Sequence, residues 1–224
     1  LPLPPNHDPV EGVDYAAPIE NGPLTRGFDY FFGISASLDM PPYVYIENDR
    51  ATALPTHLAG GVGRLPGADL QRTARELSRR AANESVDLHC TRGPAADGFI
   101  YEDVLPTFTR KALETIDRFA GEPFFLFFPL NAPHSPIVPS DEWIGKSRMN
   151  IYGDFVLMCD DVVGQIIAKV REKGIEHNTI VIFTSDNGCA PRADFDYLST
   201  GGHNPSYIFR GHKADIYEGR HRIP

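Results

Sequence analysis

The sequence predicts an α/β fold with a mostly parallel central sheet, and the pattern of its second half carries that prediction. An amphipathic stretch at residues 104–121 precedes an apolar run at 124–128, and a second pair follows at 155–174 and 179–183. The order helix, strand, helix, strand indicates a β-α-β crossover, which places two strands parallel in one sheet. With 224 residues, 42% of them hydrophobic, the chain is long enough to bury such a core.

The first hundred residues carry weaker signals. Residues 1–27 are rich in proline and glycine and predict an irregular approach segment. The aromatic stretch 28–33 and the run 43–46 predict a loop that leads into a short strand. Residues 51–100 are glycine-rich and charged, which predicts a variable surface excursion with at most one helix, near residues 68–82.

Two helices are predicted from apolar side chains at three- and four-residue spacing. The first set comprises Phe108, Ala112, Leu113, Ile116 and Phe119, and the second comprises Phe155, Cys159, Val162, Val163, Ile166, Ile167 and Val170. Gly121 and Gly174 mark the ends of the two helices, because glycine readily adopts the left-handed conformation that stops a helix.

Two strands are predicted after these helices, at residues 124–128 and 179–183. The first run is continuously apolar between Pro123 and Pro129, which favours a strand buried on both faces. Parallel strands have their carboxyl ends at one edge of the sheet, where ligands of open α/β sheets bind. The loops that begin at Asn131 and Ser185 are therefore expected to face the same crevice.

Composition excludes several classes of function. The net charge of −9 argues against a nucleic-acid-binding protein, which would present a basic patch. The longest apolar runs are far shorter than the roughly 20 residues that span a bilayer, so we expect a soluble chain with no membrane span. Cys90, Cys159 and Cys189 show no CxxC spacing, which indicates neither a disulfide framework nor a zinc site. The sequence begins at Leu1 rather than Met, and no signal peptide can be read in it, which says nothing about export.

The second predicted loop offers oxygen ligands for a metal ion. Asp186 and Asn187 stand side by side at the predicted strand end, and hard oxygen donors suit Ca²⁺ or Mg²⁺ better than Zn²⁺. The alternative is a plain turn, because Asn-Gly is a strong hairpin signal. Pro191 and the lack of an alternating partner strand weaken that alternative.

Two further features suit an anionic ligand. His134 lies in a proline-rich loop, where it could donate to an anion or protonate a leaving group, although a lone loop histidine is more often a surface residue. Residues 203–222, named here the cationic segment, include Arg210, His212, Lys213, His221 and Arg222. Such a cluster suits a tetrahedral anion, and its alternative is a solvated basic face.

Four motifs occur in a characteristic order. They are Gly27-Phe-Asp-Tyr-Phe-Phe-Gly33, Ala132-Pro-His-Ser-Pro136, Asn178-Thr-Ile-Val-Ile-Phe-Thr-Ser-Asp-Asn-Gly188, and Arg210-Gly-His-Lys213 leading to Tyr217-Glu-Gly219. Together they resemble the type I sulfatases, the arylsulfatase A-like branch of the alkaline phosphatase superfamily. The resemblance implies a central mixed, mostly parallel sheet with helices on both faces, incomplete at both ends. Residues 1–224 would form part of the large N-terminal catalytic domain.

The resemblance also implies roles for individual residues. Asp186 and Asn187 correspond to one pair of protein ligands on a Ca²⁺ ion, with Mg²⁺ as a possible substitute. His134 and Lys213 correspond to catalytic residues that bind the sulfate ester. Ser37 aligns more loosely with a serine that binds the substrate sulfate.

The implied reaction is hydrolysis of an organic sulfate ester by a metal-bound formylglycine. That residue is made from Cys or Ser in a C/S-x-P-S/A-R motif, which residues 1–224 do not contain. The nucleophile segment and the small C-terminal domain are therefore expected outside this sequence, and residues 1–224 alone are expected to be inactive. A formylglycine-generating enzyme would be a partner during maturation. The family implies a periplasmic or secreted protein, or a lysosomal one in a eukaryote.

Two other functions stay open on the sequence. One is a phosphomonoester or phosphonate hydrolase of the same superfamily, and the other is a non-catalytic relic that binds sulfated glycans. Arg220 stands where the family usually has a glycine, and it would be costly there if that position requires positive φ. A parallel sheet that lacks strands would expose an unpaired edge, which predicts poor solubility for residues 1–224 alone.

Overall fold

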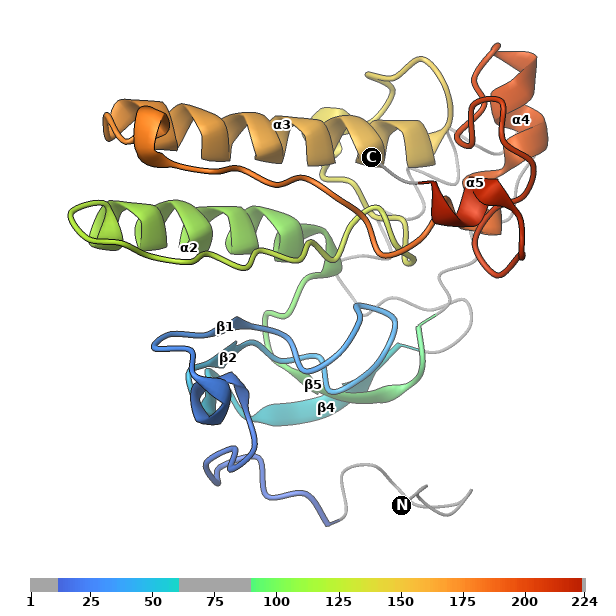
Figure 1. The fold of residues 1–224 in the computed structure, drawn as a ribbon. Coiled ribbons are helices and arrows are strands. Elements are labelled where there is room, and N and C mark those ends of the chain that lie inside the picture. Colours follow the sequence, from blue (N-terminus) through green and yellow to red (C-terminus); the bar gives the residue numbers. More distant parts are fainter. Residues whose placement is uncertain (1–11, 61–89, 223–224) are drawn as a thin grey trace. The chain divides into compact units, whose positions relative to one another are not determined.

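The computed structural model describes residues 12–60 and 90–222. The chain divides into two compact units, Leu1–Val104 and Leu105–Pro224, and each is described by itself. Figure 1 shows the ribbon with its helices and strands labelled.

The first unit is built from short strands. Its elements are the 3₁₀ helices η1 (Pro23–Arg26) and η2 (Tyr101–Asp103) and the strands β1 (Phe32–Gly33), β2 (Ile46–Glu47), β3 (Arg50–Ala51), β4 (Pro55–Ala59) and β5 (Gly93–Ala96). Strands β1, β2 and β3 pair antiparallel in that order, and β4 pairs antiparallel with β5. The strand predicted at residues 43–46 is shorter than expected, because only its last residue joins β2.

Aromatic side chains form the core of the first unit. Tyr43 and Tyr101 are fully buried, with ring centroids 5.0 Å apart, and Phe99 lies 5.9 Å from Tyr43. Ala95 and Ala96 of β5 are also buried, so this described part of the expected excursion contributes to the core. The helix predicted near residues 68–82 lies outside the described residues.

The second unit is mainly helical. Its elements are α2 (Val104–Phe119, whose first residue belongs to the first unit), η3 (Asp141–Trp143), α3 (Ile151–Glu172), η4 (Glu176–Asn178), η5 (Pro191–Ala193), α4 (Phe195–Thr200) and α5 (Glu218–His221). Both predicted helices are confirmed. The first ends two residues before Gly121, and the second ends before Gly174, which adopts φ +68°.

Helix α3 starts earlier than its apolar spacing predicts because Asn150 caps it. The Asn150 side chain accepts a hydrogen bond from the Gly153 amide at 3.0 Å and donates to the Ala193 carbonyl at 2.7 Å. The first bond satisfies an amide at the helix start, and the second ties α3 to η5. The Asn150 side chain therefore fixes the start of α3. It also holds the segment that follows the loop of Asp186 and Asn187, named here the predicted metal loop.

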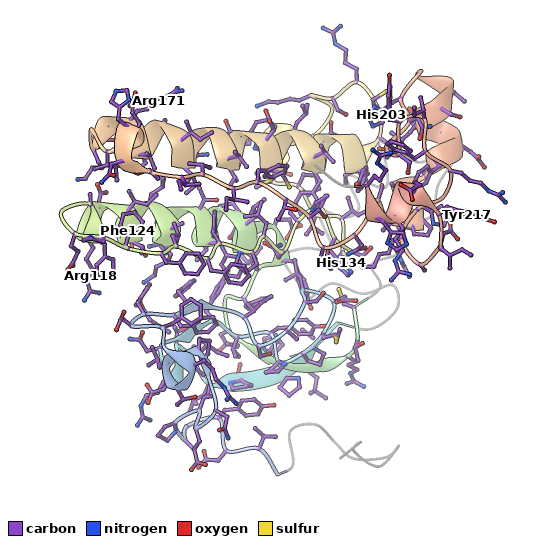
Figure 2. All side chains as sticks on the ribbon, in the orientation of Figure 1. Arg118, Phe124, His134, Arg171, His203 and Tyr217 are labelled. Carbon is purple, nitrogen blue, oxygen red and sulfur yellow. The ribbon has the colours of Figure 1, made fainter. Side chains whose placement is uncertain are left out.

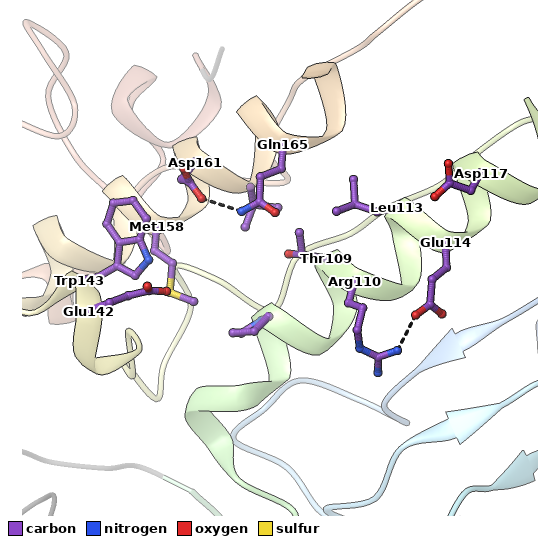
Figure 3. Close-up of a pocket in the computed structure, with 12 residues that line it drawn as sticks. Thr109, Arg110, Leu113, Glu114, Asp117, Glu142, Trp143, Met158, Asp161 and Gln165 are labelled. Atoms are coloured by element: carbon purple, nitrogen blue, oxygen red, sulfur yellow. Dashed lines mark hydrogen bonds and ion pairs between the residues drawn. The ribbon is translucent and has the colours of Figure 1, made fainter. Parts of the chain in front are cut away.

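Helices α2 and α3 lie side by side and run in the same direction (Figure 1). Near their C-terminal ends, Asp117 of α2 forms ion pairs with Lys169 at 3.3 Å and with Lys173 at 2.9 Å. Further along, a groove of about 290 Å³ lies between the helices and η3, with Trp143 and Met158 among its lining residues (Figure 3). None of the predicted site residues lines this groove.

The predicted parallel strands need a correction. Residues 124–128 and 179–183 are extended and run back along α2 and α3 (Figure 1), but neither segment forms a strand ladder with described residues. Their apolar side chains are exposed and not buried as expected: Phe125 and Phe127 are 76% and 64% exposed, and Ile180 and Ile182 are 89% and 82% exposed. A crossover connection makes two strands parallel, but it does not make them neighbours in the sheet. Segments 124–128 and 179–183 would therefore need other strands to pair with.

Candidate functional site

The predicted metal ligands lie at the end of the extended segment 179–183. Asp186 is exposed and Asn187 is half-buried, in a loop where the Ser185 hydroxyl donates to the Asn187 carbonyl at 2.9 Å. Among the residues that the structure describes, neither the Asp186 carboxylate nor the Asn187 carboxamide has a hydrogen-bond or ion-pair partner. Both side chains therefore keep their oxygens available for a ligand.

Backbone hydrogen bonds join this loop to the cationic segment. The Gly188 amide donates to the Arg220 carbonyl at 2.9 Å, and the Lys213 amide donates to the Cys189 carbonyl at 2.9 Å. Asp186 and Lys213 are 27 positions apart in the sequence, yet their loops share these two bonds. The structure thus brings the predicted metal loop and the predicted sulfate-binding lysine into one local arrangement.

Glycines permit this close approach. A Cβ at Gly188 would lie 2.0 Å from the carbonyl oxygen of Gly219, and one at Gly219 would lie 2.2 Å from the carbonyl oxygen of Gly211. Real Cβ atoms do not approach backbone so closely, so the two loops can meet only where side chains are absent. Gly211 also adopts φ +88°, a conformation that glycine reaches without steric cost.

Hydrogen bonds within the cationic segment fix the position of Lys213. The Asp215 carboxylate accepts from the His212 amide at 3.0 Å, and the His212 ring Nδ1 lies 2.9 Å from the Lys213 carbonyl oxygen. The ring of His212 also packs on Phe195, with centroids 5.2 Å apart. Lys213 itself is half-buried.

His134 follows the first extended segment and is exposed (Figure 2). Its ring Nδ1 lies 2.7 Å from the Ser135 carbonyl oxygen, which can only accept a hydrogen bond. This contact orients the ring, because the carbonyl oxygen accepts a hydrogen bond from a protonated Nδ1. The Ala132-Pro133 and Ser135-Pro136 peptide bonds on either side are both in the cis form.

Both predicted loops lie toward the same end of the helical pair. The two extended segments each return from the C-terminal end of a helix toward its N-terminal end (Figure 1). This direction agrees with the topology predicted from the sequence. Ser37 lies in the first unit, where its hydroxyl donates to the Asp39 carboxylate. Its predicted role in substrate binding stays a prediction.

The cationic segment carries more positive charge than its own carboxylates neutralise. It contains four Lys or Arg side chains and two carboxylates. Arg222 is paired with Glu218 at 3.6 Å, whereas Lys213, Arg210 and Arg220 have no carboxylate partner among the described residues. The three unpaired cations leave a local site suited to an anion.

The wall behind the metal loop is apolar. The Cys189 thiol donates to the Tyr152 hydroxyl at 3.0 Å, next to the buried side chains of Ala193 and Leu198. Burial raises the pKa of Cys189 and that of Tyr152 above their ordinary values. Both groups are therefore neutral at physiological pH and support the loop by packing.

Two oxygen ligands do not complete a calcium site. Ca²⁺ takes six to eight oxygens, and no group of three or more His, Cys, Asp or Glu side chains that could hold a metal occurs in residues 12–60 and 90–222. Asp186 and Asn187 fit the ion by the chemistry of their donor atoms.

The structure corrects one expectation and adds one residue. Arg220 lies in α5 and does not adopt positive φ, so the anticipated backbone cost does not arise.

Asn131, three residues before His134, buries its side-chain oxygen without a hydrogen-bond partner in the described structure. The sequence offered no signal for this feature beyond the position of Asn131 in the predicted loop.

Comparison with known proteins agrees with the motifs. Residues 12–224 match the family model described as Sulfatase. The chain is 31% identical to N-acetylgalactosamine-6-O-sulfatase of Bacteroides thetaiotaomicron, over 96% of this chain and 45% of that protein. It is 36% identical to N-acetylgalactosamine-6-sulfatase of Mus musculus, over 90% of this chain and 33% of that protein. The chain thus spans less than half the length of these relatives.

Solved structures support the fold. One, described with the metabolism of glycosaminoglycans by Bacteroides thetaiotaomicron, aligns with 97% of this chain and 48% of its own, with a TM-score of 0.71 and 29% identity. Another, Ps i-CgsB in complex with a neocarrahexaose, aligns at a TM-score of 0.52 and 20% identity over 88% of this chain and 39% of its own, which supports the fold alone. Among the described residues, no helix is long and apolar enough to cross a bilayer.

Proposed function

Because this chain belongs to the sulfatase family, we propose that its full-length protein hydrolyses an organic sulfate ester to an alcohol and sulfate. The main support for this proposal is the pair of backbone hydrogen bonds that joins the loop of Asp186 and Asn187 to the loop of Lys213. These bonds join the loop of the two predicted oxygen ligands to that of a half-buried lysine. That combination suits a metal-bound tetrahedral anion.

Calcium is the proposed metal, with Mg²⁺ as the alternative. Asp186 and Asn187 would supply two of its oxygen ligands, and the remaining ligands would come from outside the described residues. When bound, the ion would offset the negative charge of the sulfate group. Neither side chain has a hydrogen-bond partner among the described residues, which supports this assignment.

Lys213 and His134 are the proposed catalytic residues. The Lys213 ammonium group would bind a sulfate oxygen and offset the charge that develops as the S–O bond breaks. His134 would donate the proton that passes to the leaving alcohol oxygen, with its ring oriented by the contact between Nδ1 and the Ser135 carbonyl oxygen. Ser37 would contribute a hydrogen bond to the substrate sulfate.

The proposed nucleophile is a formylglycine from outside these 224 residues. Residues 1–224 contain no complete C/S-x-P-S/A-R motif. A formylglycine-generating enzyme would then act during maturation, and residues 1–224 alone would be inactive. A periplasmic, secreted or lysosomal location is part of the same proposal. The sugar sulfates named for the relatives make a sulfated glycan the substrate to test first.

The test is an assay of the full-length protein, co-produced with a formylglycine-generating enzyme, on an aryl sulfate with calcium or with a chelator. We expect calcium-dependent turnover that falls by roughly a hundredfold or more in Lys213→Ala, by analogy with the loss of a transition-state contact. Lys146→Ala is the control, because Lys146 is exposed and stacks on Trp143.

Two outcomes would favour the alternatives. Faster turnover of an aryl phosphate than of an aryl sulfate would indicate a phosphomonoester or phosphonate hydrolase. No turnover of either ester, together with retained binding of a sulfated glycan, would indicate a non-catalytic relic.

A further inference from the structure

Arg220 lies beside both loops of the proposed site. Its carbonyl accepts the Gly188 amide at 2.9 Å, and its Cα would be 3.0 Å from a Cβ at Gly188. Its guanidinium Nη1 donates to the Asp215 carbonyl at 3.3 Å, two residues beyond Lys213. The backbone of Arg220 therefore lies against the metal loop, and its guanidinium lies against the loop that carries the sulfate-binding lysine.

The Arg220 guanidinium has binding capacity that the described structure does not use. Guanidinium carries five N–H donors, and the bond to the Asp215 carbonyl engages one of them. Nearby, Glu218 is paired with Arg222, and Asp215 accepts from the His212 amide. No carboxylate among the described residues forms an ion pair with Arg220, whose side chain is half-buried.

Arg220 is a half-buried positive charge with no carboxylate partner among the described residues. The whole chain carries a net charge of −9, whereas the cationic segment has an excess of positive side chains. Lys213 is assigned to the sulfate that is cleaved. Arginine binds carboxylate and sulfate groups through two parallel hydrogen bonds, which suits it to a second anionic group.

We propose that Arg220 is a specificity-determining residue that binds a second anionic group on the substrate, so that the preferred substrate is a polyanionic glycan. The proposal rests on the proposed sulfatase function. The second group is a carboxylate or another sulfate on a neighbouring position of the sugar chain. Binding there would orient the glycan without taking part in cleavage of the S–O bond.

The test compares Arg220→Gln with the wild-type full-length protein on two kinds of substrate. One is an aryl sulfate with a single negative charge, and the other kind is a sulfated disaccharide that carries either a second sulfate or a uronate carboxylate. We expect KM for the doubly anionic disaccharides to rise by about tenfold or more with kcat retained, and KM for the aryl sulfate to change far less. The two disaccharides show which anionic group Arg220 prefers.

Two variants serve as controls. Arg222→Gln removes an exposed arginine that is already paired with Glu218 at 3.6 Å, and it should leave KM for every substrate unchanged. Arg220→Lys retains the charge but loses the planar fork, so it should restore part of the affinity. Both Arg220 variants keep the backbone carbonyl that accepts the Gly188 amide, so they should retain this bond.

The outcomes separate this inference from the proposed function. An equal loss on the aryl sulfate and the disaccharides would overturn the inference, because Arg220 would then support the site itself. Unchanged kinetics on all substrates would also overturn it. If the wild type turns over no sulfate ester, the proposed function fails. In that case calorimetric binding of the disulfated disaccharide to wild type and Arg220→Gln decides the role of Arg220, and equal affinities reject it.

Discussion

Gly188 lies so close to Gly219 that a Cβ at position 188 would be 2.0 Å from the Gly219 carbonyl oxygen. The contact joins the predicted metal loop to the cationic segment, and the Gly188 amide donates to the neighbouring Arg220 carbonyl. The arrangement of the candidate site therefore depends on the absence of a side chain at position 188.

Gly188→Ala should separate the two loops. We expect a loss of about 1–3 kcal/mol in the free energy of unfolding, because the added methyl group must displace backbone. Calcium-dependent turnover should fall as well, since the Lys213 loop shifts with it. Urea unfolding and an aryl sulfate assay of the full-length protein measure the two effects.

Gly164→Ala is the matched control for that substitution. Gly164 lies within α3, and no atom lies within 4 Å of the Cβ that alanine would add. Alanine should therefore stabilise the protein by about 0.4–1 kcal/mol. Equal effects of the two substitutions would show that the close approach at Gly188 is unimportant.

Asp154→Ala should destabilise the second unit. The buried Asp154 carboxylate accepts from the Gly145 amide at 2.7 Å and from the Ser147 amide at 2.8 Å. Alanine leaves both amides without this partner, which should cost about 1–3 kcal/mol. Asp160→Ala, at an exposed position on the same helix, should change the urea midpoint little. Similar midpoints for the two variants would contradict the structural role of Asp154.

The free energy of unfolding should fall at alkaline pH. Burial raises the pKa of Cys159 from 9.0 to about 12, so the folded thiol stays protonated where the unfolded thiol ionises. Its contribution is complete below pH 9 and is lost as pH rises from 9 toward 12, with a slope of up to about 1.4 kcal/mol per pH unit. Urea titrations at several pH values should show a shallower slope for Cys159→Ala. An identical slope would exclude Cys159 as a cause.

Calcium should raise the melting temperature of the full-length protein, because a ligand bound only to the folded state stabilises it. Asp186→Asn removes one negatively charged oxygen ligand, so the calcium-dependent rise should shrink. Differential scanning calorimetry with calcium and with a chelator measures this difference. Asp160→Asn should behave as wild type, and a full calcium response in Asp186→Asn would argue against a metal role for Asp186.

Residues 1–224 alone should self-associate through the extended segment 179–183. Ile182 is 82% exposed, and the segment has no partner strand among the described residues. Ile182→Lys should reduce association of this chain in light scattering, because an added charge discourages edge pairing. In the full-length protein the same change should lower the melting temperature, since the completed sheet would bury position 182. A monomeric, cooperatively melting sample of the unsubstituted chain would contradict the prediction.

The sequence determined the helices, the family and the candidate residues. The spacing of apolar residues is a local property, so α2 and α3 could be predicted from it. The four motifs between Gly27 and Gly219 indicated the family by their residues and their order. Predictions failed where they depended on partners, as for the paired strands at 124–128 and 179–183. Hydrogen-bonded ladders form between segments, and no single segment specifies its neighbour.

Only the tertiary structure decided how the loops of the site meet. Gly188 and Gly219 allow their backbones to approach the carbonyl oxygens of Gly219 and Gly211 within distances that a Cβ would prevent. Those approaches place Arg220 beside the metal loop in a helical conformation, whereas the motif alone suggested a strained position. The physical reason is that local sequence sets which conformations a residue can adopt, whereas contacts between distant segments select the one that it does adopt.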